Sequence, residues 1–429
     1  MKKQLKPKQL KPLARRLKEL PVEKIPDRRS ARGWHRHLFL SLVNALILGM
    51  ATARRSLRQV ETLTEHLHPK VRKITQIWGR ISDSKLRDAQ NAISAEDVRP
   101  LLHSQIKIEH RRGTLKPVEG LPFGIVALDG KGLGILDSWE HPNIQKVQPE
   151  GRAPYGKALV HRTTLVSSVA PVCIDQRPVP GDTNEIGACK ATLEQRFETY
   201  GKTSLFEMVA ADAGNASAAV ATQIDAANYA NLLRMKENHG GIYCNALAAV
   251  HKTTPVSRSE RYSGPKDARR KHVYHFYQMR PEEGRDYHWA HLRQWLCLVH
   301  EVFDEAGALL KQTQRLWASN LPWKRLKVPQ WLLVLRRYWR CENNNHWTAD
   351  VFFKEDARRQ PWTKAPETLF MLANLRMLAL NITAIRRAMS RASGTHAHPQ
   401  PLGWRETLDL ILTWAYSGRC YQNPQPLLL

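Results

Sequence analysis

The sequence lacks the residue patterns that would place it in several common classes of protein. Its six cysteines form no CxxC pair, and its 18 histidines include no HExxH motif. A structural zinc site is therefore not expected. The cysteines instead predict reduced, mostly buried thiols in a reducing compartment. No internal repeat is present in the chain.

The sequence also has no apolar run as long as a membrane-spanning helix normally requires. The most apolar segment, 38–53, contains Asn44 and is flanked by Arg36 and Arg54. It is too short for a typical bilayer span and predicts a buried helix of a globular domain. The run starts too late in the chain, and without a convincing cleavage site, for a signal peptide. We therefore expect a soluble intracellular protein with no membrane partner.

Acidic residues are scarce. The 429-residue chain has 39 Asp and Glu against 66 Lys and Arg, which gives a formal net charge of +27 and a pI of about 10.1. An excess of this size favours a polyanionic partner such as DNA or RNA. A ribosome-associated or membrane-surface protein is the alternative. Hydrophobic residues make up 42% of the chain, which is enough for a large core in two or three domains.

The N-terminal part of the chain is basic and then helical. Residues 1–25 are rich in Lys and Arg and are interrupted by Pro7, Pro12 and Pro21. They predict a flexible arm that attracts phosphate, or a solubilising tail. Residues 26–115 predict a helical domain of short helices, in which Ser82 is an N-cap. This domain either binds DNA or braces a catalytic domain, and its charge favours DNA.

Strand and helix patterns alternate from residue 116 to 239, the first part of a catalytic domain. Apolar runs rich in strand formers predict strands at 123–128, twice within 158–179, at 205–211 and at 229–236. Helices are expected at 183–201, capped by Thr183 and ended by Gly201, and at 216–228. This order predicts an α/β fold, a mixed sheet with helices on its faces, whose first three strands form an antiparallel meander.

A β-rich insertion is predicted at 240–325. Strands are expected at 271–279 and 312–321, and a strand or short helix at 295–303. Its tryptophans are expected in a core rather than under DNA bases: Trp289, Trp295, Trp317 and Trp323. The second part of the catalytic domain, 326–393, has a helix that starts near Pro329 and a long helix at 365–391. The tail, 394–429, contains one apolar segment that could add a packed helix, 408–416.

Three acidic residues stand out by their positions. Asp129 and Asp212 each follow an apolar strand pattern, and Glu342 lies in the helix after the insertion. Carboxylates on rigid elements are what a two-metal phosphodiester-cleaving site needs. Each residue also has an ordinary interpretation: a turn residue for Asp129, a helix cap for Asp212, and a solvated salt-bridge partner for Glu342. Their ordered context in a basic chain favours the metal site.

Several segments resemble bacterial insertion-sequence DDE transposases, in particular the group that includes the H-repeat-associated proteins. ALDGK (127–131) resembles the first-aspartate motif, and VAADAGNAS (209–217) lies where the second aspartate falls. RYWRCENNNHWTADVFFKEDA (337–357) resembles the glutamate motif and is the most specific part of the match. DTNEI (182–186), LLRMKENHG (232–240) and the segment 26–63 resemble further parts, so the match covers about 26–391 in the family's order.

The resemblance implies a ribonuclease-H-like catalytic domain that cleaves transposon ends and joins their 3′ hydroxyls to target DNA. It implies that Asp129, Asp212 and Glu342 bind Mg²⁺, with Mn²⁺ as a substitute, and that Lys131 contacts phosphate. Further positions match the glutamate motif and are expected around the metal site: Asn343, His346 and Asp350. For Trp347 in the same motif we expect a packing role.

The expected partner is double-stranded DNA, both the transposon ends and the target, bound by a homodimer or a larger assembly in a bacterial, nucleoid-associated, cytoplasmic setting. Basic residues of the insertion and of the helix after it are the expected phosphate contacts: Arg269, Arg270, Lys271, Arg336, Arg337 and Arg340. Two alternatives remain. One is a domesticated DNA-binding protein that does not cut, and the other is a host nuclease on the same fold that cuts without joining.

Overall fold

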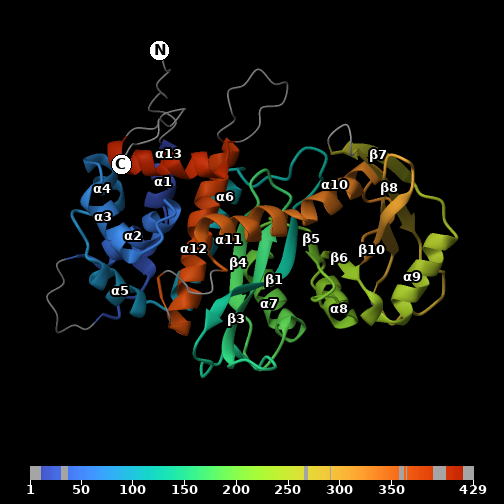
Figure 1. The fold of residues 1–429 in the computed structure, drawn as a ribbon, viewed down its shortest axis with the longest axis horizontal. Helices are drawn as coiled ribbons and strands as arrows, with labels where there is room; N and C mark the ends of the chain where they lie inside the picture. Colours follow the sequence, from blue (N-terminus) through green and yellow to red (C-terminus); the bar gives the residue numbers. More distant parts are fainter. Residues whose placement is uncertain are drawn as a thin grey trace, which may run out of the picture. The chain divides into compact units, whose positions relative to one another are not determined.

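The computed structural model describes residues 11–29, 37–264, 269–289, 291–356, 362–363, 365–389 and 402–418 (Figure 1). The chain divides into two compact units. Unit 1 comprises Met1–Lys116, Gly130–Thr183 and Arg340–Leu429, and unit 2 comprises Pro117–Asp129 and Asn184–Trp339. Each unit is therefore built from segments that are distant in the sequence.

Helix α12 (Pro366–Met389) is the main core helix of unit 1. It contacts α2 (Phe39–Ala51), α6 (Ala95–Arg111) and strand β4 (Val172–Pro178). Among the described residues, α12 is the one helix long and apolar enough to cross a membrane, but all of its apolar stretch is buried within the protein. Helix α2 is also almost entirely buried. The predictions of a buried helix at 38–53 and of a long helix at 365–391 are thus confirmed.

Short helices complete the N-terminal part of unit 1 (Figure 1). They are α3 (Leu57–Glu65), α4 (Pro69–Thr75) and α5 (Asp83–Asn91), together with α1 (Lys11–Lys18) and a short 3-10 turn at Val22–Lys24. The Ser82 side chain accepts a hydrogen bond from the Lys85 amide and caps α5, as predicted. Near the other end of the unit, α13 (Trp404–Ser417) contacts α12, which confirms the packed helix expected in the tail.

The flexible arm predicted at 1–25 is wrong for its second half. Residues from Lys11 to Lys18 form α1, and Arg16 is only 7% exposed. Its guanidinium donates two hydrogen bonds, each 2.9 Å, to the carboxylate of Glu109 on α6. Because a buried cation needs a partner, this pair holds α1 against α6. Residues 1–10 lie outside the described part of the chain.

The strands of unit 1 surround β3 (Tyr155–Leu165). This strand pairs antiparallel with β2 (Ile144–Val147) and with β4, and it neighbours β1 (Ile125–Leu136) in the sheet. These strands pack on α12 through a cluster of apolar residues: Leu133, Leu136, Ile144, Ala158, Val160, Leu369, Phe370 and Ala373. Strand β2 was not predicted, and β1 continues through Asp129 and Gly130 where the sequence predicted a turn.

The strands of unit 2 run in the order β1-β5-β6-β10-β9-β8-β7, with the first residues of β1 at one edge. β1, β5 (Met208–Ala211) and β6 (Ala230–Met235) are parallel to one another. β10 (Leu309–Ser319) pairs antiparallel with β6, and β9 (Gln294–Phe303), β8 (Arg270–Met279) and β7 (Ser257–Ser263) follow it, all antiparallel. The strands predicted at 271–279 and 312–321 are confirmed, 295–303 also lies in a strand, and together with β7 they extend the parallel part of the sheet.

Helices of unit 2 accompany these strands. They are α7 (Glu185–Tyr200), α8 (Ala218–Ala226), α9 (Gly241–His251) and α10 (Val328–Tyr338). Helix α7 ends at Gly201 as predicted, but its N-cap is Asn184 and not Thr183, because the Asn184 side chain accepts the bond from the Gly187 amide. Taken together, the chain is an α/β protein with a mixed sheet and flanking helices.

Candidate active site

Asp129 and Asp212 occupy matched positions on neighbouring strands of unit 2. The parallel pairing of β1 with β5 places Leu128 opposite Ala211, and the next residue along the chain is an aspartate in both cases: Asp129 within β1 and Asp212 just after β5. Neighbouring strands lie about 4.8 Å apart, and matched positions direct their side chains to the same side of a sheet. All four residues of β5 are buried, whereas both aspartates are partly exposed. Carboxyl ends of parallel strands are where α/β sheets bind ligands.

Two residues that the sequence did not single out surround Asp212. Asn215 is completely buried and donates from Nδ2 to Asp212 Oδ1 at 3.0 Å and to Glu185 Oε2 at 3.4 Å. Glu185 is the first residue of α7, where the helix dipole favours a negative charge. The side-chain amide of Asn215 thus links the carboxylate of Asp212, just after β5, to that of Glu185 at the start of α7. The only signal for this in the sequence is the position of Glu185 within DTNEI.

Gly214 leaves space beside the carboxylates of Asp212 and Glu185. A methyl group added at Gly214 would lie 3.4 Å from both Asp212 carboxylate oxygens and 3.6 Å from Glu185 Oε2, so the glycine keeps this space open. The donor atoms here are oxygens, and Mg²⁺ is commonly held by one or two carboxylates together with phosphate oxygens. Within the described residues, no group of three or more His, Cys, Asp or Glu is placed to hold a metal ion.

Glu342 belongs to unit 1 and lies on a helix of unusual geometry. The sequence predicted one helix from Pro329 through Glu342, but α10 ends at Tyr338 and residues Cys341–His346 form a π-helical turn. The Trp347 amide donates to the Glu342 carbonyl five residues earlier, and α11 (Trp347–Phe353) follows. The Glu342 side chain is exposed. Single π-helical turns occur frequently at functional sites.

A buried charge network lies in unit 1 and includes this π-helical turn. Arg162 on β3 donates to both carboxylate oxygens of Glu355, at 2.7 and 2.8 Å, and both side chains are completely buried. It also donates to Asn345 of the turn at 3.3 Å and to Gln176 of β4 at 3.0 and 2.8 Å. Arg376 of α12 lies 3.7 Å from Glu355. The network therefore connects β3, β4 and α12 to the segment that carries Glu342.

Sequence reasoning missed this network. Arg162 lies within a strand pattern, between His161 and Thr163 in a largely apolar run, and Glu355 is part of the segment that resembles the glutamate motif. A charged residue in a strand that is otherwise buried was the available signal, because a charge is buried only when it is paired. The identity of the partner could not be read from the sequence, since Arg162 and Glu355 are 193 positions apart.

Two of the residues expected near the metal site pair with each other in unit 1. Lys131 Nζ lies 2.5 Å from Asp350 Oδ2, so the lysine expected to contact phosphate is an ion-pair partner. Burial raises the pKa of Asp350, and Lys131 opposes this shift. His346 is buried, and burial together with Arg162 and Lys131 holds its pKa well below its ordinary value. Asn343 is exposed; Trp347 is 52% exposed and its ring meets Phe352 edge-on at 5.9 Å, so the packing expected of it is partial.

The expected phosphate contacts are distributed over several environments. Arg269 stacks on Tyr262, Lys271 pairs with Glu260 at 3.0 Å, and Arg270 is exposed on β8. On α10, Arg336 is exposed, whereas burial lowers the pKa of Arg337. Arg340 donates to the Ser168 carbonyl at 3.4 Å. Trp289, Trp295 and Trp317 are buried, as predicted, and Trp323 is half-buried under Arg280.

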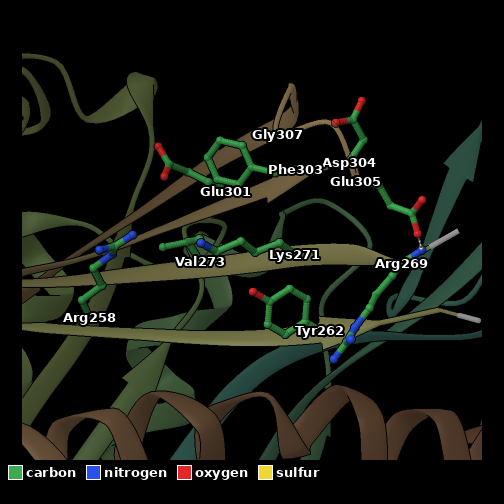
Figure 2. Close-up of a pocket in the computed structure, with 10 residues that line it drawn as sticks. All are labelled: Arg258, Tyr262, Arg269, Lys271, Val273, Glu301, Phe303, Asp304, Glu305 and Gly307. Carbon is green, nitrogen blue, oxygen red and sulfur yellow. Dashed lines mark hydrogen bonds between the residues drawn. The ribbon is translucent and has the colours of Figure 1, made fainter. Parts of the chain in front are cut away.

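A hollow of about 480 Å³ lies among the insertion strands of unit 2 (Figure 2). Arg258, Lys271 and Glu301 line it, and the Arg269 amide donates to Glu305 at 2.9 Å at its rim. The cations of this hollow are therefore interspersed with carboxylates. Arg269 and Lys271, which were both expected to contact DNA, line this hollow together with acidic residues.

Comparison with known proteins gives a likeness in structure but none in sequence. Neither models of protein families nor curated protein sequences match the chain. Among solved structures, a piggyBac transposase in a synaptic complex with hairpin DNA is similar, with a TM-score of 0.43 and 9% identity over 95% of this chain and 78% of that chain. At this identity and TM-score, the similarity assigns neither a family nor an activity to the chain.

Proposed function

We propose that this protein is a DDE-type transposase, which cleaves DNA strands at transposon ends and joins the 3′ ends to target DNA. The observation that carries the proposal is the matched placement of Asp129 and Asp212 after paired residues of β1 and β5. The net charge of +27 supports a DNA partner, and the motifs around both aspartates and around Glu342 support the reaction class. A ribonuclease-H-like arrangement of the catalytic strands is part of the proposal.

Asp129 and Asp212 would hold Mg²⁺, or Mn²⁺ in its place, and Glu342 would be the third carboxylate. When bound, the metal would stabilise the attacking and leaving oxygens of the phosphodiester. Asn215 fixes the orientation of the Asp212 carboxylate through its 3.0 Å hydrogen bond. In unit 1, the contact of Arg162 with Asn345 holds the π-helical turn from which Glu342 projects. The chain's own part in the reaction is therefore to hold and orient oxygen ligands.

The test uses Asp129→Asn and Asp212→Asn in full-length protein, with a supercoiled plasmid that carries the DNA flanking the gene. Each variant should lose at least about 1,000-fold of the Mg²⁺- or Mn²⁺-dependent cleavage, equivalent to about 4 kcal/mol in the transition state. Mn²⁺ binding, followed by electron paramagnetic resonance, should weaken in both. Asp137→Asn is the matched control, because Asp137 is exposed just after the end of β1.

Each outcome separates the proposal from its alternatives. Cleavage by either variant at the wild-type rate would show that Asp129 and Asp212 are not the metal ligands. Cleavage by the wild type without joining of the 3′ ends to a second plasmid would favour a host nuclease. Salt-sensitive DNA binding with neither cleavage nor Mn²⁺ binding would favour a domesticated DNA-binding protein.

A further inference from the structure

One face of the insertion sheet in unit 2 carries an unusual concentration of positive charge. In an antiparallel sheet, directly opposed residues project to the same side, and alternate residues along a strand share that side. The register of β7 to β10 and of β6 therefore assigns each side chain to one of two faces. The first, called here the basic face, includes Arg234, Arg261, Arg270, His272, Tyr274, His300, Lys311 and Arg315.

The two faces differ in their acidic residues. At the register-paired positions of these described strands, the basic face has no Asp or Glu. On the opposite face, Glu260 lies 2.8 Å from Arg258 and 3.0 Å from Lys271, and Glu301 lies 3.2 Å from His275. Figure 2 shows this opposite side, where Glu301 lies among the cations. Carboxylates thus lie beside the cations of the opposite face, whereas the described register-paired positions of the basic face carry none.

Aromatic rings order the cations of the basic face. Arg261 lies over Tyr274 at 5.3 Å, and Tyr274 stacks on His300 at 4.4 Å with an interplanar angle of 2°. His300 in turn stacks on His272, with 3.0 Å between their ring nitrogens. Because the flat faces of the rings are occupied by one another, this column is not a platform for unpaired bases. It restricts the Arg261 guanidinium and so reduces the entropy lost when that group binds an anion.

A second pair of stacked cations continues the row across the sheet. Arg315 on β10 and Arg234 on β6 lie over the same ring, that of Trp339, at 4.6 and 5.7 Å. The row from Arg261 on β7 to Arg234 on β6 crosses five adjacent strands. Four strand spacings of about 4.8 Å give a width of about 19 Å. This exceeds the roughly 12 Å width of the DNA major groove, so the row can reach phosphates on both of its sides.

The electrostatics of His300 reflect the same concentration of charge. Burial lowers the pKa of His300, and four nearby side chains lower it further: His272, Arg261, Arg315 and Lys311. Protonation of His300 is therefore disfavoured, and an anion bound near it is favoured. A polyanion would relieve this repulsion, and counterions released from it would add to the binding free energy.

We propose that the basic face binds the sugar–phosphate backbone of double-stranded DNA. This inference rests on the proposed function for the identity of the ligand. It also revises the sequence prediction that Arg269, Arg270 and Lys271 all contact phosphate. Arg270 belongs to the basic face, whereas Lys271 belongs to the opposite face and Arg269 lines the hollow there. Contacts to phosphate position a duplex without reading its sequence, so binding at this face is independent of base sequence.

The test compares two triple variants of the full-length chain, each of which removes three positive charges from the insertion. Binding of a 30-base-pair duplex is measured by fluorescence anisotropy at several salt concentrations. Circular dichroism and thermal unfolding check that both variants fold. The basic-face variant changes three exposed residues: Arg261→Gln, Arg270→Gln and Lys311→Gln. The control variant changes three cations of the opposite face: Arg258→Gln, Arg269→Gln and Lys271→Gln.

The basic-face variant should bind duplex DNA at least about 10-fold more weakly at 0.1 M salt, and its salt dependence should fall by about three counterions. The control should stay within about 2-fold of the wild type. Equal weakening of the two variants, or tighter binding of RNA than of DNA of the same length, would overturn the assignment of this face and leave the proposed cleavage reaction standing. Failure of the wild type to bind duplex DNA would instead refute the proposed function as well.

Discussion

The two regions that carry the candidate catalytic acids are held in place by different forces. Asp129 and Asp212 directly follow Leu128 and Ala211, the last residues that pair β1 with β5, so backbone hydrogen bonds of the sheet set their positions. Glu342 lies on a π-helical turn whose Asn345 is held by the buried Arg162–Glu355 network. The first region depends on strand register and tolerates side-chain change. The second depends on side-chain charges and should be more fragile.

The largest expected effect is on the fragile region. Glu355→Gln leaves Arg162 and Arg376 buried without the carboxylate they share, and removal of one partner from a buried pair costs about 3–5 kcal/mol. Chemical denaturation measures this loss. Glu260→Gln is the matched control, because Glu260 also pairs with two cations but is one-third exposed, and it should cost less than about 1 kcal/mol. Similar losses in the two variants would show that the buried network contributes no special stability.

The next effect decides which region supplies the third acid. Glu342→Gln should reduce cleavage by at least about 100-fold, or about 2.7 kcal/mol, with little change in stability because the side chain is exposed. Glu185→Gln removes the carboxylate that shares Asn215 with Asp212, and it should reduce cleavage by less than about 10-fold. The reverse order of effects would transfer the third metal-binding role from Glu342 to Glu185.

A smaller effect concerns the ion pair of Lys131 and Asp350 in unit 1. Because burial raises the folded-state pKa of Asp350, its ionisation destabilises the protein as pH rises through that pKa. Lys131→Met removes the group that opposes this shift, so the free energy of unfolding of the variant should be lower by about 1–2 kcal/mol at pH 7. The deficit should shrink as pH falls and Asp350 takes up its proton. In an Asp350→Asn background, Lys131→Met should cost little at any pH; a constant deficit would refute the coupling.

The contrast between the regions also explains what the sequence could predict. The buried strands before Asp129 and Asp212 were visible as apolar runs, and both aspartates follow such runs. The match between Leu128 and Ala211 was not visible, because register depends on how two distant strands pair. Strand β7, SRSERYS, has no apolar alternation and is almost fully exposed, so only its pairing with β8 reveals it. The basic face follows from the same cross-strand register.

Long-range side-chain contacts are the other feature that could not be predicted from the sequence. The π-helical turn shifts the hydrogen bond of Trp347 by one residue, a change that no hydrophobic period records. The link from Arg162 to Asn345 and Glu355 joins segments that only the tertiary fold brings together. The sequence therefore predicted Glu342 by resemblance, while the reason for its local geometry had to come from the structure.

The smallest effect tests the open space beside Asp212. In Gly214→Ala the new methyl group would lie 3.4 Å from both Asp212 oxygens, an ordinary contact that does not strain the fold. Stability should therefore be unchanged or higher by up to about 1 kcal/mol, because alanine reduces the entropy of the unfolded chain. The methyl group would occupy space that metal-bound water needs, so Mn²⁺ should bind about 3- to 10-fold more weakly, or by about 0.7–1.4 kcal/mol.

Gly132→Ala provides the matched control for this change. A methyl group at Gly132, which lies on β1, meets no atom within 4 Å, so the same substitution should leave Mn²⁺ affinity unaltered. If Gly214→Ala binds Mn²⁺ as tightly as Gly132→Ala, the metal does not occupy the side of Asp212 that faces Glu185. The register-matched aspartates would then have to hold it on the side away from Asn215, and Glu185 would have only a structural role at the start of α7.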